Sequence, residues 1–520
     1  MDTKTGEALY SRFLRGLARS PRGVAIRVGP ESITYEQAHQ RALRWAGALA
    51  RTRPRAVGVL AAKGVTAYTG ILAALYAGAA AVPLRPDFPV ARTRQMLTAS
   101  GATALVADGD GTAVLGRLLA DPTDITVLAP DGGWPATIAA GQRSALDQPA
   151  AVRPQDPACV LFTSGSTGRP KGVVITHGAT GHYFRLLDAR YDFTAGDVFS
   201  QTFDLNFDCA LFDMFSAWGA GAQLLAVPPH AYRELPAFLR EHRVTVWFST
   251  PSAIALIRRT GGLGAGTMPG LRWSLFAGEA LQCRDAAGWQ RAAPASAVEN
   301  LYGPTELTVT VTAHRWSPER SPRLAVNGVV PIGALHDGHE HMLLDRDGQP
   351  DDEGELCVTG PQLSPGYLDP GDDRGRFEER DGRRWYRTGD RVRWAGGELI
   401  YLGRVDSQVQ VQGWRLELAE VEHALRTHAP VRDAVAVGLP AHGTTELVVF
   451  YTGSPVPAVE LARRLRQVLP EGVIPRHYHQ LDEFPLNSNR KIDRARLAVC
   501  ARELHLAVRG QAADDSVKEA

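Results

Sequence analysis

Apolar runs of strand length alternate with helical stretches over the first third of the chain. The helical stretches place apolar residues three and four positions apart, and Thr34 suits the N-cap of one of them. Buried strands separated by helices are typical of a parallel sheet that is covered on both faces. The pattern predicts helices at 8–18, 34–50 and 66–80, a strand pair at 24–33, and strands at 57–60, 81–84, 105–106 and 125–128.

Beyond residue 160 the same pattern continues and then changes. Residues 323–402 are rich in Gly, Asp and short alternating runs, which indicates a small β subdomain. The chain is therefore predicted to be of the α/β class: a large N-terminal domain (1–402) of parallel or mixed sheets with this β subdomain, then a small α+β domain (403–508) and a disordered tail (509–520). Within these regions we expect helices at 178–195, 418–425 and 458–469, and strands at 158–162, 173–176, 244–247, 274–277, 409–411, 435–439 and 446–452.

Composition narrows the function classes. The chain has 520 residues and a formal net charge of +1, which argues against nucleic acid or an anionic membrane as partner. Its five cysteines lack CxxC spacing, which suits a reduced cytosolic protein without a metal cluster. The most apolar window, 70–84, is short and interrupted by Gly and Pro, and the N-terminus lacks the apolar stretch of a signal peptide. A soluble cytoplasmic protein is expected.

A Ser-, Thr- and Gly-rich segment between two apolar runs is the first candidate for chemistry. Hydroxyls and unshielded backbone N–H groups can surround phosphate oxygens, and Lys171 adds a positive charge beside them. A plain hairpin or linker would have a similar composition. The segment does not fit the P-loop pattern, which needs Lys followed directly by Ser or Thr. Its candidate phosphate-binding residues are Thr163, Ser164, Gly165, Ser166, Thr167, Gly168 and Lys171.

The ordered string TSGSTGRPKG resembles the phosphate-binding loop of the adenylate-forming superfamily, which includes acyl-CoA synthetases and the amino-acid adenylation domains of nonribosomal peptide synthesis. Four further motifs are similar to those of the same family and follow in its order: YGPTE (302–306), TGD (388–390), GRVDSQVQ (403–410) and PLNSNRKIDR (485–494). The resemblance covers roughly 34–494, with Gln410 and Arg490 departing from the usual Lys and Gly. The segment AGAAAVPLRP (77–86) resembles the family's AGAAYVPLDP and is interpreted as packing.

The resemblance implies a set of ATP contacts. Tyr302 would lie against adenine, Thr305 on the phosphate, and Asp390 on both ribose hydroxyls. Glu306 would hold Mg²⁺, which prefers hard oxygen ligands. Lys491 would be the catalytic lysine, acting with Glu306 and Thr163, and Asp406 the hinge about which the C-terminal domain moves. Gly278, Gly303, Tyr401 and Arg404 complete the implied nucleotide site.

The family's position for an amino-anchoring aspartate falls in the segment QTFDLNFDCALFDMF. Anchoring on its Met-Phe end selects Asp208, and Asp204 is the alternative in the other register. A surface aspartate or a helix cap remains the plainer interpretation of either residue. A buried carboxylate should meet a cation, here the substrate's ammonium group. The implied pocket consists of Asp208, Cys209, Phe212, Phe248, Leu275, Ala277, Leu301, Val309 and Thr310, together with Lys491.

This resemblance implies a two-step reaction with ATP and Mg²⁺. A carboxylate attacks the α-phosphorus of ATP, and a thiol then takes the acyl group from the adenylate. The apolar pocket favours an amino acid with an apolar or aromatic side chain, although a β-amino or ring-containing amino acid would also satisfy an aspartate anchor. Because no carrier-type Ser motif follows Lys491, the expected acceptor is the phosphopantetheine thiol of a separate carrier protein. An aryl- or acyl-CoA ligase and a catalytically idle ATP-binding protein remain alternatives.

Overall fold

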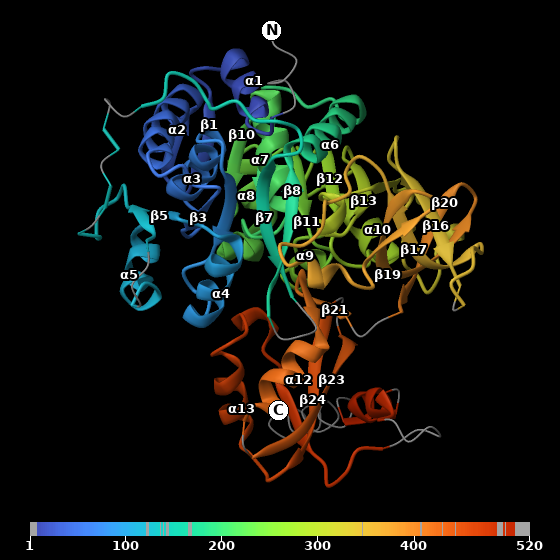
Figure 1. The fold of residues 1–520 in the computed structure, drawn as a ribbon. Coiled ribbons are helices and arrows are strands. Elements are labelled where there is room, and N and C mark those ends of the chain that lie inside the picture. The colour runs from blue at the N-terminus through green and yellow to red at the C-terminus, as the bar shows by residue number, and fades with distance from the viewer. Residues whose placement is uncertain are drawn as a thin grey trace, which may run out of the picture. The chain divides into compact units, whose positions relative to one another are not determined.

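The computed structural model describes residues 8–120, 124–135, 137–138, 140–141, 145–164, 169–345, 347–405, 408–428, 430–441, 444–485, 492–494 and 496–504. By its contacts the chain divides into two compact units, drawn in Figure 1. Unit 1 comprises Met1–Phe162 and Lys171–Asp406, and unit 2 comprises Thr163–Pro170 and Ser407–Ala520. Within the described residues, none of the helices is both long and apolar enough to cross a membrane.

A nine-stranded sheet forms the larger half of unit 1, in the order β15-β14-β13-β12-β11-β9-β10-β1-β2. Its central strands, from β1 to β13, run parallel, and antiparallel strands close both edges. The bounds are β1 Val24–Val28, β2 Glu31–Thr34, β9 Val198–Gln201, β10 Gln223–Ala226, β11 Val246–Ser249, β12 Trp273–Phe276, β13 Ala297–Tyr302, β14 Thr312–Arg315 and β15 Ala334–Leu335.

A second sheet of six strands has the order β6-β5-β3-β4-β7-β8, with parallel pairing from β6 through β7. The bounds are β3 Ala56–Leu60, β4 Ala80–Leu84, β5 Ala104–Ala107, β6 Thr126–Leu128, β7 Pro157–Thr163 and β8 Lys171–Thr176. The predicted parallel sheet and most of its strands are therefore confirmed. The strand pair expected at 24–33 is also present, as the antiparallel β1 and β2.

Helices cover both sheets and lie between them. The helices of unit 1 are α1 Ser11–Arg19, α2 Tyr35–Ala50, α3 Val65–Tyr76, α4 Val90–Ser100, α5 Gly109–Leu118, α6 His177–Arg190, α7 Cys209–Ala220, α8 Leu235–Glu241, α9 Ser252–Arg259, α10 Cys283–Ala292 and α11 Ser321–Leu324. Short 3-10 helices occur at η2 Pro229–Glu234, η3 Thr305–Leu307 and η4 Pro370–Asp373. Both α3 and α7 are buried along their whole length, and they share one hydrophobic cluster with strands of both sheets. A second cluster packs α8, α9 and α10 on the other face of the larger sheet.

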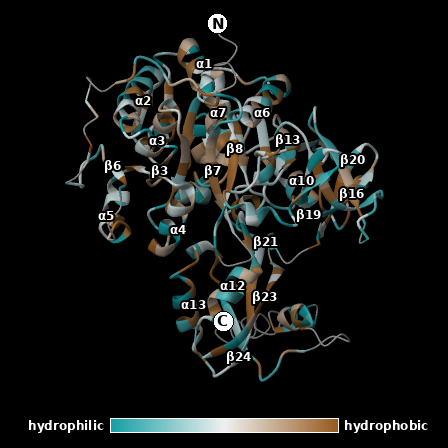
Figure 2. Cartoon of the chain, viewed as in Figure 1, coloured by the Kyte–Doolittle hydropathy of each residue, from teal (hydrophilic) through white to brown (hydrophobic). Residues whose placement is uncertain are grey.

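Two local predictions met different outcomes. Thr34 caps α2 as expected, and its hydroxyl accepts from the backbone N–H of Gln37 while the Gln37 side chain accepts from the N–H of Thr34. The helix expected at 178–195 ends at Arg190, because Tyr191 takes an extended backbone and the chain turns at Asp197. The apolar strands at the centre of Figure 2 are flanked by hydrophilic outer loops, in keeping with a layered core.

The predicted β subdomain is a five-stranded antiparallel sheet, β16-β17-β19-β18 with β20 on β19, and unit 2 is of the predicted α+β type. The subdomain strands are β16 Glu340–Leu344, β17 Glu353–Thr359, β18 Phe377–Arg380, β19 Arg383–Ala395 and β20 Glu398–Arg404. Unit 2 contains β21 Gln408–Val411, β22 Trp414–Glu417, α12 Leu418–Arg426, β23 Val431–Ala441, β24 Thr444–Gly453, α13 Ala458–Leu465, η5 Glu471–Val473 and β25 His477–Gln480. Its β23-β24-β25 sheet packs against α12 and α13.

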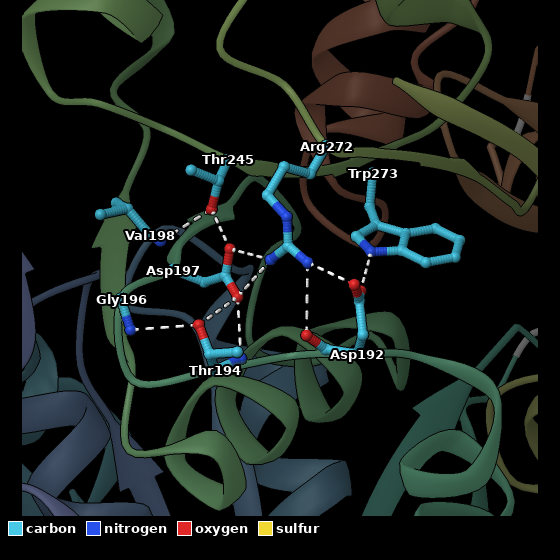
Figure 3. Close-up of polar contacts among 8 residues, drawn as sticks. All are labelled: Asp192, Thr194, Gly196, Asp197, Val198, Thr245, Arg272 and Trp273. Atoms are coloured by element: carbon cyan, nitrogen blue, oxygen red, sulfur yellow. Dashed lines mark hydrogen bonds and ion pairs between the residues drawn. The ribbon is translucent and has the colours of Figure 1, made fainter. Parts of the chain in front are cut away.

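A buried carboxylate joins the amino ends of three neighbouring strands in the larger sheet (Figure 3). Asp197, just before β9, accepts from the backbone N–H of Thr194 at 2.8 Å and from the Thr245 hydroxyl at 2.7 Å. Arg272, just before β12, donates to both Asp197 oxygens at 2.7 Å and pairs with Asp192 at 2.6 Å. Since Asp197 is only 2% exposed, the network satisfies a charge that water cannot reach.

We expect Arg272→Ala to lower the free energy of unfolding of unit 1 by about 3 kcal/mol, because it leaves the buried Asp197 without its cation. The measurement is the melting temperature and the denaturant midpoint. Arg233→Ala, at an exposed site, is the matched control and should have no effect. A melting temperature equal to that of the wild type would contradict a stabilising role for this network.

Candidate active site

The predicted substrate pocket lies at the carboxyl ends of three neighbouring parallel strands, where ligands gather in open α/β sheets. Phe248 is paired in register with Leu275, and Leu301 follows two residues after Glu299, the register partner of Leu275. These side chains face the cluster between the two sheets, whereas Trp247 and Phe276 face the opposite cluster. The strand period of two thus directs Phe248, Leu275 and Leu301 to one surface.

Helix α7 supplies the facing wall. Phe212 lies one turn into the helix, and its ring centroid is 4.8 Å from that of Phe248, which in turn is 4.7 Å from that of Phe203. The Thr310 hydroxyl lies 3.1 Å from that of Tyr183, a residue of α6 in the same hydrophobic cluster. One hydrophobic cluster contains seven of the nine predicted pocket residues: Cys209, Phe212, Phe248, Leu275, Ala277, Leu301 and Val309.

Asp208 stands at the start of α7 without capping it. Its side chain makes no cap hydrogen bond to the helix, and the residue is 7% exposed. Its Oδ2 atom is buried with no hydrogen-bond partner among the described residues. The nearby polar groups of Thr305 and Cys209 favour its ionised form but do not offset its burial. Burial raises the pKa of Asp208 to about 6. Such a group is neither a surface aspartate nor a helix cap.

Asp204 occupies a different setting. It forms an ion pair with Arg85, and its Oδ1 atom is 3.8 Å from the Lys63 ammonium group. Two cations of the protein therefore already balance its charge. Of the two aspartates that the sequence left open, Asp208 is the one with an unsatisfied oxygen beside the apolar wall.

The loop after β13 carries Val309 and Thr310 in an unusual backbone. Thr308 and Val309 have φ values of +57° and +70°, which β-branched residues rarely adopt. The Gln362 side-chain amide donates to the carbonyls of Leu307, Thr308 and Thr310 at 2.9–3.1 Å and holds this shape. At Gly303 the loop crosses the chain so closely that a Cβ atom would lie 2.6 Å from the Cα of Thr310.

Glu306 and Lys171 approach each other through one tyrosine. The Tyr367 hydroxyl donates to Glu306 Oε1 at 2.6 Å, and Glu306 is 1% exposed. Lys171 lies over the Tyr367 ring, 5.4 Å from its centroid, and 3.7 Å from Asp372. The Tyr367 side chain thus contacts both the Glu306 carboxylate and the Lys171 ammonium group.

The predicted nucleotide residues of unit 1 form a second group. The Tyr302 hydroxyl donates to Asp390 Oδ2 at 2.6 Å, and Arg404 donates to Asp390 Oδ1 at 2.8 Å. Burial first, and then the Asp390 charge, raises the pKa of Tyr302, so its hydroxyl stays protonated and remains a donor. Tyr401 packs in the same small cluster as Tyr302. Gly278 has a φ of +85° at the bend after β12, which favours glycine there.

The structure leaves part of the predicted site undescribed. Gly165, Ser166, Thr167, Gly168, Asp406 and Lys491 lie outside the described residues. Thr163 ends β7 and is half-buried. By its contacts, Ser164 belongs to unit 2. Its hydroxyl donates to the Arg415 carbonyl at 2.6 Å and accepts from the Glu417 N–H at 3.0 Å.

Two residues near the site were missed from the sequence. Gln362 and Tyr367 belong to the segment GPQLSPGYL (360–368), for which no site residue is predicted from the sequence. Their contacts join residues more than fifty positions apart in the chain, and local periodicity carries no signal for such pairs. Two polar side chains inside an otherwise apolar or glycine-rich segment were the only available indication.

The chain has a parallel α/β core, and the YGPTE motif begins at the carboxyl end of β13, where ligands gather in such sheets. A model of the family "AMP-binding enzyme" matches residues 13–368. L-proline--[L-prolyl-carrier protein] ligase of Streptomyces coelicolor is 34% identical over 459 residues, which are 83% of this chain and 84% of that protein. The chain therefore belongs to the AMP-binding enzyme family.

Solved structures agree with this assignment. The crystal structure of IdnL7 is 60% identical in sequence, covers 96% of this chain and 99% of its own, and has a TM-score of 0.76. The Vibrio cholerae adenylation domain AlmE, solved with glycyl-adenosine-5'-phosphate, is 27% identical, with a TM-score of 0.84 and coverage of 95% of this chain and 98% of its own.

Asp390→Asn is expected to weaken ATP binding about tenfold or more, because the carboxylate is the acceptor around which Tyr302 and Arg404 are arranged. Calorimetric titration with ATP, without the second substrate, measures the change. Asp381→Asn makes the same chemical change at an exposed turn and should bind ATP like the wild type. Equal affinity in Asp390→Asn and the wild type would remove Asp390 from the nucleotide site.

Proposed function

We propose that this protein uses ATP to activate an amino acid as its aminoacyl-adenylate and then transfers the aminoacyl group to the phosphopantetheine thiol of a separate carrier protein. The observation that carries the proposal is Asp208: a buried carboxylate with one unsatisfied oxygen at the start of α7, beside an apolar wall. A ligase for simple aryl or fatty acids would gain nothing from such a charge, whereas an ammonium group would neutralise it.

An apolar side chain suits the rest of the pocket. Its predicted lining is apolar except for Thr310, whose hydroxyl already meets Tyr183. The rings of Phe212 and Phe248 contact each other, with centroids 4.8 Å apart, so little space remains between α7 and β11. These contacts favour the small members of the apolar class over the aromatic ones.

The chemistry of the first step is the approach of two anions, the substrate carboxylate and the α-phosphate. We propose that Lys171 screens this repulsion and that Glu306, a hard carboxylate ligand of the kind that suits Mg²⁺, would hold the metal. The described residues contain no group of three or more His, Cys, Asp or Glu side chains that could hold a metal ion. When bound, Mg²⁺ would neutralise charge on the departing pyrophosphate. The protein then needs to orient its substrates, and no side chain has to act as nucleophile.

The remaining roles belong to residues outside the described part of the chain. We propose that Lys491 contacts the substrate carboxylate and the developing charge at phosphorus during adenylation. We further propose that the C-terminal domain, from about residue 403, turns about Asp406 to admit the carrier thiol, and that Ser166 and Thr167 orient the leaving phosphates. Two similar proteins are carrier-protein ligases by name, which supports a carrier protein as acceptor.

The deciding experiment is ATP–pyrophosphate exchange with a panel of amino acids, aryl acids and fatty acids. We expect exchange with small apolar amino acids only. Asp208→Asn should raise KM for the amino acid roughly 10- to 100-fold with a smaller change in kcat, because it removes the partner of the ammonium group. Asp204→Asn is the neighbouring comparison and should affect KM less. Exchange supported by a simple aryl or fatty acid, and by no amino acid, would refute the proposal.

The pH profile gives a second measure of Asp208. Only the ionised carboxylate can pair with the substrate ammonium, and the free-enzyme pKa is raised to about 6. Consequently kcat/KM for the amino acid should be level above pH 6 and fall about tenfold per pH unit below it. The Asp208→Asn variant should lack this step. A step that persists in the variant would assign the titration to another group.

Phe248→Val should widen specificity, because it separates the two contacting rings and opens space beside Phe212. The ratio of kcat/KM for leucine to that for alanine is expected to rise about tenfold. Phe276→Val on the neighbouring strand is the matched control, since Phe276 faces the opposite cluster. An unchanged ratio in Phe248→Val would show that this ring does not limit the pocket.

A further inference from the structure

Two cations of the six-stranded sheet reach the loop that leads into Asp208. Lys63 follows β3, and Arg85 follows directly after β4, so both stand at the carboxyl edge of that sheet. The loop at 202–208 belongs to the other sheet and connects β9 to α7. The contacts therefore join the two sheets beside the proposed substrate anchor.

The contacts converge on Thr202 and Asp204. The Lys63 ammonium donates to the Thr202 carbonyl at 2.7 Å and is 3.8 Å from Asp204. Arg85 makes an ion pair with Asp204 through one arm of its guanidinium and with Asp87 through the other. The Lys63 side chain is 23% exposed and those of Arg85 and Asp204 about a third, so solvent screens these pairs only in part.

The same loop touches the pocket wall. The Thr202 hydroxyl donates to the Phe248 carbonyl at 2.5 Å, and the neighbouring Phe203 ring contacts the Phe248 ring. The Asp204 carbonyl accepts from the Phe207 N–H at 3.0 Å, which forms the turn that brings in Asp208. A displacement of Thr202 or Asp204 would consequently move both the wall at Phe248 and the carboxylate at Asp208.

The acid that forms an ion pair with Lys63 is Asp204, 3.8 Å away. A second acid near Lys63, Asp213 on α7, is fully buried, and burial raises its pKa well above the ordinary value. The segment 77–86 was interpreted as packing alone; its Arg85 stands where the related pattern has Asp, and it contacts an aspartate across the sheets.

We propose that Lys63, Arg85 and Asp204 form an electrostatic clamp that fixes the 202–208 loop and so positions Asp208 and Phe248 for amino-acid recognition. They are positioning residues, since none of them needs to touch the substrate. The kinetic consequence rests on the proposed function, whereas the effect on the loop does not. Specificity for the amino acid then depends partly on charges contributed by the other sheet.

The clamp also lines a cavity of about 380 Å³, together with Pro83, Leu84 and Asn206. Because this cavity is open to water, shortening or neutralising a clamp side chain leaves solvent in its place and creates no dry void. Variants should therefore fold, and their effects should appear in the loop.

The test compares Lys63→Met, Arg85→Met, Asp204→Asn and the double variant Arg85→Met with Asp204→Asn. Arg85→Lys keeps the charge, and Arg153→Met, which breaks an exposed ion pair with Asp156, is the control. We expect amide hydrogen exchange in 202–208 to speed up about tenfold in the neutral variants, with the melting temperature nearly unchanged. In the neutral variants the KM for the amino acid should rise about tenfold, while the KM for ATP stays constant. The double variant should show no larger rise in the amino-acid KM than either of its single variants. Arg85→Lys should have an amino-acid KM close to that of the wild type.

The outcomes separate the clamp from the proposed function. Unchanged exchange in 202–208 in all neutral variants would overturn the clamp. Faster exchange with unaltered amino-acid KM would overturn its role in recognition. Faster exchange in an enzyme whose wild type activates no amino acid would support the clamp as a holder of the loop and refute the proposed function instead. Additive effects in the double variant would show that Arg85 and Asp204 act separately.

Discussion

Keeping a carboxylate ionisable inside an apolar wall is the constraint on which this active-site region depends. Asp208 is buried, does not cap its own helix, and keeps one oxygen unsatisfied. Such a group costs free energy unless it is hydrogen-bonded or paired with a cation. The loop before α7 is held against the pocket wall by the contacts of Thr202 and Phe203 with Phe248.

Much of the fold could be predicted because its local signals agree with one another. The alternation of apolar strands with helices predicted the parallel sheet, and Thr34 marked the start of α2. The helix α7 was not predicted, since it is buried on every side and lacks an amphipathic period. The helix expected to reach residue 195 stops at Arg190, because Asp197 draws the following backbone into a turn that depends on Thr245 and Arg272.

The candidate site likewise contains residues that could be located from the sequence and residues that could not. Motifs located Tyr302, Glu306 and Asp390, because each is part of an ordered string. The choice between Asp204 and Asp208 could not be made from the sequence, because it depends on the ion pairs of Asp204. Its partners, Arg85 and Lys63, lie more than a hundred residues earlier in the chain. Pairs between separate sheets leave no periodic trace in sequence, and for that reason the segment 77–86 was assigned to packing.

The Gln362 amide donates to the carbonyls of residues 307, 308 and 310, and so separates the backbone shape of this loop from the identity of its side chains. One side chain from outside the loop thus contacts three of its backbone carbonyls, while Val309 packs in the pocket cluster and the Thr310 hydroxyl meets that of Tyr183. Substitutions at these two positions can therefore alter what is recognised without having to specify the loop again. Such an arrangement makes the loop suitable for diversification, in nature or in a designed library, as long as Gln362 is retained.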